Sequence, residues 1–111
     1  MKRDGWKEFR RSVPVFAALG DETRLSMLGK LSREGPQSIA RLSAGTNVTR
    51  QAVTKHLRVL EDAGLVSSKR EGREAVFTVE PEGFDRSKEL LELISRRWDE
   101  TLERLREFVE E

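Results

Sequence analysis

Cysteine is absent from this 111-residue chain, and histidine occurs once, at His56. The absence of cysteine excludes disulfide bonds, thiolate metal sites and cysteine nucleophiles, and it is consistent with a reducing compartment. One histidine cannot build a multi-histidine metal site within a single chain, and no aspartate or histidine lies three or four residues away from it. The sequence therefore predicts neither a metal site nor a cofactor.

Long apolar runs are also missing. No segment approaches the roughly 18 consecutive apolar residues that span a membrane, and residues 1–7 are basic without the apolar stretch of a signal peptide. We therefore expect a cytoplasmic protein with no membrane contact. The length suits one hydrophobic core, which predicts a single domain over residues 1–111.

Patterns typical of catalysis are lacking as well. The sequence has no glycine-rich phosphate loop and no Ser/His/Asp order that suggests a nucleophile. Acidic side chains are numerous, but they fall mostly on the solvated face of the last predicted helix. We therefore expect that the protein is not an enzyme.

The net charge of +1 is unevenly distributed along the chain. Residues 49–73 carry six basic and three acidic side chains, a net +3, whereas residues 82–111 carry six basic and ten acidic side chains, a net −4. A basic region beside an acidic one is expected when one surface meets a polyanion and another does not. Charge alone does not distinguish this interpretation from the alternative that both regions are ordinary solvated faces.

Apolar residues recur at helical spacing in the first part of the chain. A helix is expected over residues 6–19, where Pro14 predicts either a kink or two separate pieces, and Gly20 ends it. Asp21 is suited to cap a second helix over residues 22–32. The inward positions of this second helix are expected to be Leu25, Leu28 and Leu31.

Glycine and proline then divide the middle of the chain. Residues 35 and 36 end the second helix, and Ser38 opens a short third helix, followed by a turn at residues 45–47. Thr49 caps a fourth helix that runs to about Ala63, where Gly64 supplies a left-handed cap. The positions that pack this fourth helix inward are Val53, Leu57 and Leu60.

Two β-like runs, residues 65–69 and 74–79, flank a predicted hairpin loop over residues 71–73. Pro81 ends the second run, and a long last helix follows from about residue 84 or 85 to Val109. The order of helix, tight turn, helix and hairpin predicts a mainly α (α+β) fold. It is a winged helix-turn-helix with about five helices and one β-hairpin wing.

The outward face of the fourth helix suits the major groove of duplex DNA. Arg50 can form two hydrogen bonds to guanine and Gln51 can do so to adenine, while Thr54 offers a hydroxyl to a base or a methyl group to thymine. Lys55 and Arg58 are expected to anchor phosphates, and the helix start at Thr49 offers free amides to a phosphate. In the wing, the expected backbone or minor-groove contacts are Lys69, Arg70 and Arg73.

His56 lies beside the inward stripe at the edge of this face, and a structural or phosphate-contacting role is expected for it. Two alternatives to DNA binding stay open at this point. The basic face is either an ordinary solvated helix face or a surface of a winged-helix module that docks an acidic protein partner.

The apolar stripe of the last helix has two interpretations. It covers the domain's own core, or it covers a second copy of the chain, because so long a helix has little intramolecular surface left to cover. The second interpretation predicts a homodimer in which residues 1–19 and 84–111 are the dimerisation helices. The expected interface residues are Trp6, Phe9, Val13, Phe16, Leu91, Ile94, Trp98, Leu102, Leu105 and Val109.

Four segments together resemble the ArsR-type (arsenical-resistance repressor-like) family of bacterial transcription regulators. Residues 16–25 are similar to the family's entry into its second helix, and residues 48–60 are similar to its recognition helix. Residues 61–66 and the wing at residues 70–73 complete the match, which covers roughly residues 13–80. The resemblance implies a homodimer that binds an inverted-repeat operator and usually represses transcription.

The sequence departs from the metal-sensing members of that family. Those members carry cysteines in the third helix, or His, Asp and Glu ligands in the last helix. Here residues 38–44 contain no cysteine, and residues 84–111 contain no histidine. The metal-sensing role and a thiol redox switch therefore do not carry over. The operator and any small-molecule inducer, such as an apolar ligand between the first and last helices, stay open.

Overall fold

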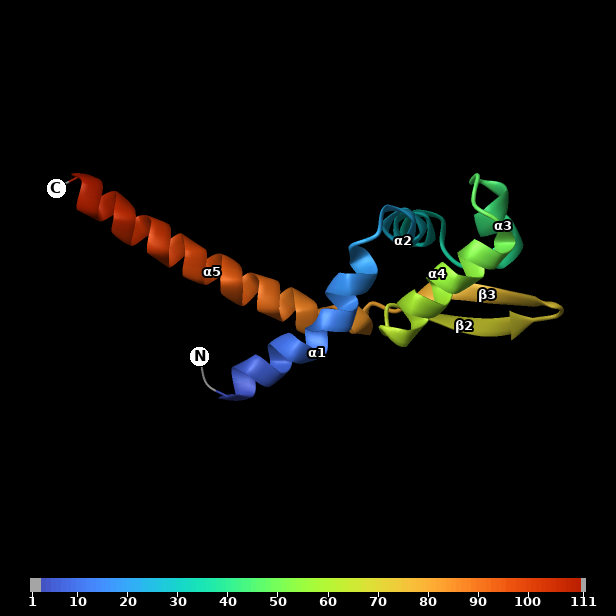
Figure 1. The fold of residues 1–111 in the computed structure, drawn as a ribbon, viewed down its shortest axis with the longest axis horizontal. Coiled ribbons are helices and arrows are strands. Elements are labelled where there is room, and N and C mark those ends of the chain that lie inside the picture. The colour runs from blue at the N-terminus through green and yellow to red at the C-terminus, as the bar shows by residue number, and fades with distance from the viewer. Residues whose placement is uncertain (1–2, 111) are drawn as a thin grey trace.

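The computed structural model describes residues 3–110, with the side chains of residue 7 and residues 9–110. Across this range the elements follow in the order α1, α2, β1, α3, α4, β2, β3 and α5. In Figure 1, α2, α3, α4 and the strands form one body, and α5 projects from it as a long rod. This arrangement confirms the mainly helical winged helix-turn-helix fold expected from the sequence.

Helix α1 spans Arg3–Leu19 without interruption and contains Pro14. The expectation of two separate helical pieces is therefore wrong. Pro14 has no N–H to donate to the carbonyl oxygen one helical turn earlier. Because Pro14 is exposed, water can donate to that oxygen instead. The helix ends before Gly20, as the sequence predicted, and the amide of Gly20 donates back to the carbonyl oxygens of Phe16 and Ala17.

Helix α2 spans Glu22–Glu34, two residues longer than predicted, and Asp21 caps it by accepting a hydrogen bond from the Arg24 amide. Leu28 and Leu31 are buried as expected, and Met27 joins them. The prediction that Leu25 points inward is wrong, because this side chain is 55% exposed. At 3.6 residues per turn it lies about 120° around the helix from Leu31, outside the buried stripe.

Helices α3 (Ile39–Ala44) and α4 (Arg50–Asp62) form the helix-turn-helix pair. Ser38 and Thr49 cap them as predicted, each accepting a hydrogen bond from an amide three residues later. At the other end of α4, Gly64 has a φ of 78°. Its amide donates to Glu61 and that of Leu65 to Leu60, the paired hydrogen bonds of a Schellman cap.

The wing consists of β2 (Val66–Glu71) and β3 (Glu74–Val79), which pair antiparallel in the register Val66↔Val79. The turn between them is one residue tighter than the predicted loop, because Glu71 still pairs with Glu74. A third strand, β1 (Gln37–Ser38), pairs with β3 at Gln37↔Phe77 and was not predicted. Two residues are too short to carry an alternating pattern, and only the tertiary pairing makes them a strand.

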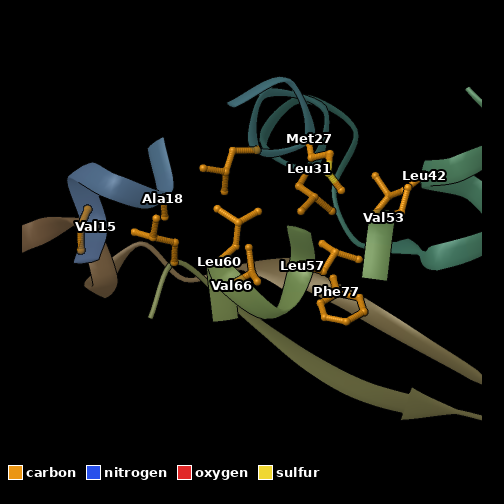
Figure 2. Packing of buried hydrophobic residues seen from close by; sticks show 12 residues of the cluster. Val15, Ala18, Met27, Leu31, Leu42, Val53, Leu57, Leu60, Val66 and Phe77 are labelled. Atoms are coloured by element: carbon orange, nitrogen blue, oxygen red, sulfur yellow. The ribbon is translucent and has the colours of Figure 1, made fainter. Parts of the chain in front are cut away.

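The core lies between α2, α4 and the root of the wing. In Figure 2, Leu57 and Leu60 of α4 point toward Met27 and Leu31 of α2, and Phe77 of β3 closes the cluster. Leu57 and Leu60 are fully buried. This packing fixes the face that α4 turns away from the body.

Helix α5 spans Glu82–Glu110 and starts two residues before the earliest predicted position. Its first turn lies against the end of α4, where a Cβ at Gly83 would overlap the carbonyl oxygen of Gly64. The 29-residue helix is roughly 43 Å long, so most of it extends beyond the body. No helix among the residues described is both long and apolar enough to cross a membrane.

Candidate nucleic-acid interface

Helix α4 presents two faces of opposite character. Val53, Leu57 and Leu60 lie on the inner face and are at most 1% exposed. On the outer face, the predicted readers and anchors Arg50, Gln51, Lys55 and Arg58 are all exposed. The structure therefore brings these four side chains together on one accessible surface, as the helical spacing predicted.

Two hydroxyl groups on this helix already have partners. The Thr49 Oγ1 accepts a hydrogen bond from the Ala52 amide at 3.1 Å, as the cap of α4. The Thr54 Oγ1 donates to the carbonyl oxygen of Arg50 at 2.8 Å. Because the proton of Thr54 is used inside the helix, this side chain offers a base its oxygen lone pairs or its methyl group, rather than a donor.

The predicted wing residues are exposed, but they do not share one face of the hairpin. Lys69 and Arg70 are adjacent in β2, so their side chains point to opposite faces. Arg70 is on the face of Ser68, whose hydroxyl donates to Glu61 Oε2 at the end of α4, at 2.8 Å. Arg73 lies in the turn at the tip. Of the two strand residues, Arg70 therefore lies on the face that looks toward α4.

His56 does not point freely outward with the predicted readers. Its Nδ1 lies 3.4 Å from the Arg24 Nη1 and 3.9 Å from the Asp21 Oδ1. These partners are more than thirty residues away in the chain, so no local spacing signals them. Sequence reasoning gave Asp21 only a capping role and gave Arg24 none.

The cap of α2 changes the acidity of Asp21. The hydrogen bond from the Arg24 amide is the main cause that lowers the pKa of this carboxyl below its ordinary value of 3.8, and the charges of Arg24 and His56 act in the same direction. Because the folded state favours the ionised form, Asp21 stabilises the fold above its ordinary pKa. This contribution is lost as the pH falls through the lower folded pKa.

A comparison of the wild type with Asp21→Asn tests this effect, because asparagine retains the cap but does not titrate. We expect the wild type to be the more stable protein at neutral pH, and its advantage to disappear as the pH falls below 3.8. Urea unfolding across that pH range measures the difference. Parallel pH profiles for the two proteins would contradict the assignment.

The apolar stripe of α5 is exposed in the single chain. The α1 residues Val13 and Phe16 are also exposed, and Phe9 is half-buried. The side chain of Trp6 lies outside the described residues. The exposed α5 residues of the predicted interface are Leu91, Ile94, Trp98, Leu102, Leu105 and Val109.

Candidate metal ligands are scattered over the residues that the structure describes. No three His, Asp or Glu side chains lie close enough to hold an ion within the part of the chain described. His56 has Asp21 and Arg24 as neighbours, with its Nδ1 3.4 Å from the Arg24 guanidinium and 3.9 Å from the Asp21 carboxylate.

Comparisons with known proteins agree with this geometry. The helix-turn-helix domain family matches residues 19–68. The HTH-type transcriptional regulator YuzN of Bacillus subtilis, described as uncharacterized, is 45% identical over 75 residues, covering 60% of this chain and 82% of the relative.

Solved structures extend the likeness to most of the chain. The ArsR-like transcriptional regulator from Rhodococcus sp. RHA1 is 36% identical with a TM-score of 0.77, covering 90% of this chain and 93% of that one. A winged helix-turn-helix domain of Mb0332 from Mycobacterium bovis, 21% identical, has the same fold with a TM-score of 0.68, covering 86% and 88%. The buried stripe and basic outer face of α4 thus occur within a fold and a sequence pattern that relatives share, and this chain belongs to the ArsR family of helix-turn-helix, DNA-binding transcriptional regulators.

Proposed function

We propose that the chain forms a homodimer that binds an inverted-repeat operator in duplex DNA and represses transcription from it. The observation that carries the proposal is the orientation of α4. Its apolar stripe is locked in the core, so its exposed side chains, Arg50, Gln51, Lys55 and Arg58, are held outward at the spacing of one helix face. Such a helix fits a major groove roughly 12 Å wide.

The side chains of this face have different roles in the proposal. Arg50 and Gln51 read bases, because their paired polar atoms match the edges of guanine and adenine. Lys55 and Arg58 contact phosphates and fix the register. On the wing, Arg70 faces the same side as α4, whereas Arg73 at the tip reaches the adjacent backbone or minor groove.

The homodimer follows from the exposed apolar stripe. Trp98 is 62% exposed in the single chain, on a helix that leaves the body, so nothing in the same described chain covers it. The Mycobacterium bovis domain with the same fold is homodimeric, which supports the same assembly here. In the proposed dimer, residues 1–19 and 84–111 supply the contacts, and the two α4 helices enter successive major grooves about 34 Å apart.

The regulatory signal, in this proposal, is not a metal bound through thiolates. The chain has no cysteine, and its single histidine is engaged by Arg24 and Asp21. A chain with this composition lacks the soft ligands by which thiolate-rich sites select their metals.

Selection of bound fragments from genomic DNA, followed by titration of the selected duplex, tests the function directly. Arg50→Ala and Gln51→Ala should each weaken binding to the selected site by about 1–3 kcal/mol and relax the base preference at one position. Arg96→Ala is the matched control for Arg50→Ala, because it removes the same charge from an exposed position on α5, away from the interface stripe. Unchanged specific binding in both reader variants would refute the groove assignment.

Substitution of a phosphate-contacting residue, Lys55 or Arg58, should change DNA binding in a different way. Lys55→Ala should weaken binding about equally on all sequences and reduce the slope of log K against log salt by about 1. A fluorescence anisotropy titration at several salt concentrations measures both quantities. If the wild type bound no duplex even at low salt, DNA binding would be contradicted and an acidic protein partner would be favoured.

A further inference from the structure

The side chain of Arg24 lies where α1, α2 and α4 meet. Its Nε donates to the carbonyl oxygen of Ala18 at 2.8 Å, and its Nη2 donates to that of Ala17 at 3.3 Å. Both carbonyls belong to the last turn of α1, where no further amide of the helix follows to pair with them. The oxygen of Ala17 also accepts from the Gly20 amide at 3.3 Å. Arg24 therefore joins the beginning of α2 to the end of α1.

The third donor group of Arg24 reaches the recognition helix. Its Nη1 lies 3.4 Å from the Nδ1 of His56, and the two side chains are only 18% and 23% exposed. Arginine has no acceptor, so a hydrogen bond between these two groups requires the neutral ring of His56 with its proton on Nε2 and Nδ1 as the acceptor. Asp21 lies 3.9 Å from both groups and supplies a compensating charge.

We propose that Arg24 is a positioning residue that sets α4 against α1 through His56. The apolar core decides which face of α4 points outward, and the directional hydrogen bonds of Arg24 add a constraint on the exact rotation and position of the helix. The proposal assigns His56 to this contact and not to DNA, and it rests on the proposed DNA-binding function.

A dimer gives this contact a functional consequence. In the proposed dimer, α1 belongs to the interface and α4 reads DNA. The contacts of Arg24 that join α1 to α4 in each copy therefore help to set the distance between the two α4 helices of the dimer. An operator with two half-sites requires one fixed distance between the two α4 helices, whereas binding to a single half-site does not depend on that distance. Loss of the contact should therefore weaken binding to the complete operator more than binding to one half-site.

Arg24→Lys isolates this role, because lysine keeps the positive charge beside Asp21 but cannot supply the rigid three-way fork. On the complete selected operator we expect about a tenfold loss of affinity. On a single half-site the loss should stay below about twofold. Arg33→Lys, an exposed position on the same helix, is the matched control and should match the wild type on both duplexes.

Two substitutions of His56 test the same contact from its other side. Asparagine can place an acceptor near the position of Nδ1, whereas phenylalanine cannot. We expect His56→Asn to bind like the wild type and His56→Phe to reproduce the loss caused by Arg24→Lys. The double variant Arg24→Lys/His56→Phe should lose little more operator affinity than either single variant, because both changes break the same interaction. If Arg24→Lys fails to fold, the comparison of His56→Asn with His56→Phe still tests the contact between Arg24 and His56.

A measurement without DNA separates this inference from the proposed function. His56 is the only histidine, so its two ring nitrogens are readily assigned by NMR in the free protein. At a pH where the ring is neutral, the wild type should carry its proton on Nε2, and Arg24→Lys should lose this preference. Equal losses on complete and half operators, or a proton fixed on Nδ1 in the wild type, would overturn the inference even if the protein binds its operator.

Discussion

Trp98→Ala combined with Leu102→Ala should convert the proposed dimer into a monomer in sedimentation velocity. Both side chains are exposed in the single chain, at 62% and 55%, and they lie one turn apart on the same face of α5. Large buried side chains at the centre of an interface each contribute about 2 kcal/mol or more. Because a twofold dimer contains every substitution twice, the four lost side chains sum to about 8 kcal/mol, and the dissociation constant should rise by about 10⁵-fold or more.

The double variant should also bind the operator more weakly, because two half-sites are then bound by separate molecules. Arg96→Ala is the control on the same helix, and it should leave both the sedimentation and the DNA affinity unchanged. Circular dichroism distinguishes dissociation from unfolding of α5. A wild type that is monomeric at micromolar concentration would contradict the proposed assembly.

Gly83→Ala and Gly29→Ala should change stability in opposite directions. A Cβ at Gly83 would overlap the carbonyl oxygen of Gly64, and this contact is backbone against backbone, so no side chain can move to relieve it. The start of α5 would have to shift away from the end of α4, at a cost of about 1–3 kcal/mol or more. At Gly29, inside α2, nothing lies within 4 Å of the added Cβ.

The expected gain at Gly29 is about 0.5–1 kcal/mol, because alanine loses less backbone entropy than glycine when a helix forms. Urea unfolding of the two variants beside the wild type measures both effects. Because Gly64 ends the reading helix, Gly83→Ala should also lower DNA affinity, whereas Gly29→Ala should not. A neutral Gly83→Ala would show that the two helix ends are not held in close contact.

Local signals in the sequence were sufficient for the starts of α2, α3 and α4 and for the end of α4. Asp21, Ser38 and Thr49 each cap the helix that was predicted to follow, because capping needs only one side-chain oxygen and an amide three residues away. Gly64 adopts the left-handed conformation predicted for it. Such interactions span a few residues, so they can be deduced without knowledge of the fold.

Other features depended on contacts between distant segments. Gln37 belongs to a strand only because Phe77 pairs with it, and Leu25 is exposed because the body covers a different stripe of α2. Spacing alone placed Leu25 with Leu28 and Leu31, but it could not show where the buried stripe is centred. Helical periodicity gives the faces of a helix, whereas packing decides which face is covered.

The sequence by itself determined the order of the five helices and the hairpin, the buried stripe of α4 and the exposed basic side chains that oppose it. All of these follow from local hydrogen bonds and from the helical repeat. The tertiary structure alone decided that Arg24 meets His56 across 32 residues of sequence, and that Gly83 lies against Gly64. These contacts arise only when α1, α2, α4 and α5 come together, because folding, and not the spacing of residues along the chain, brings their atoms within reach.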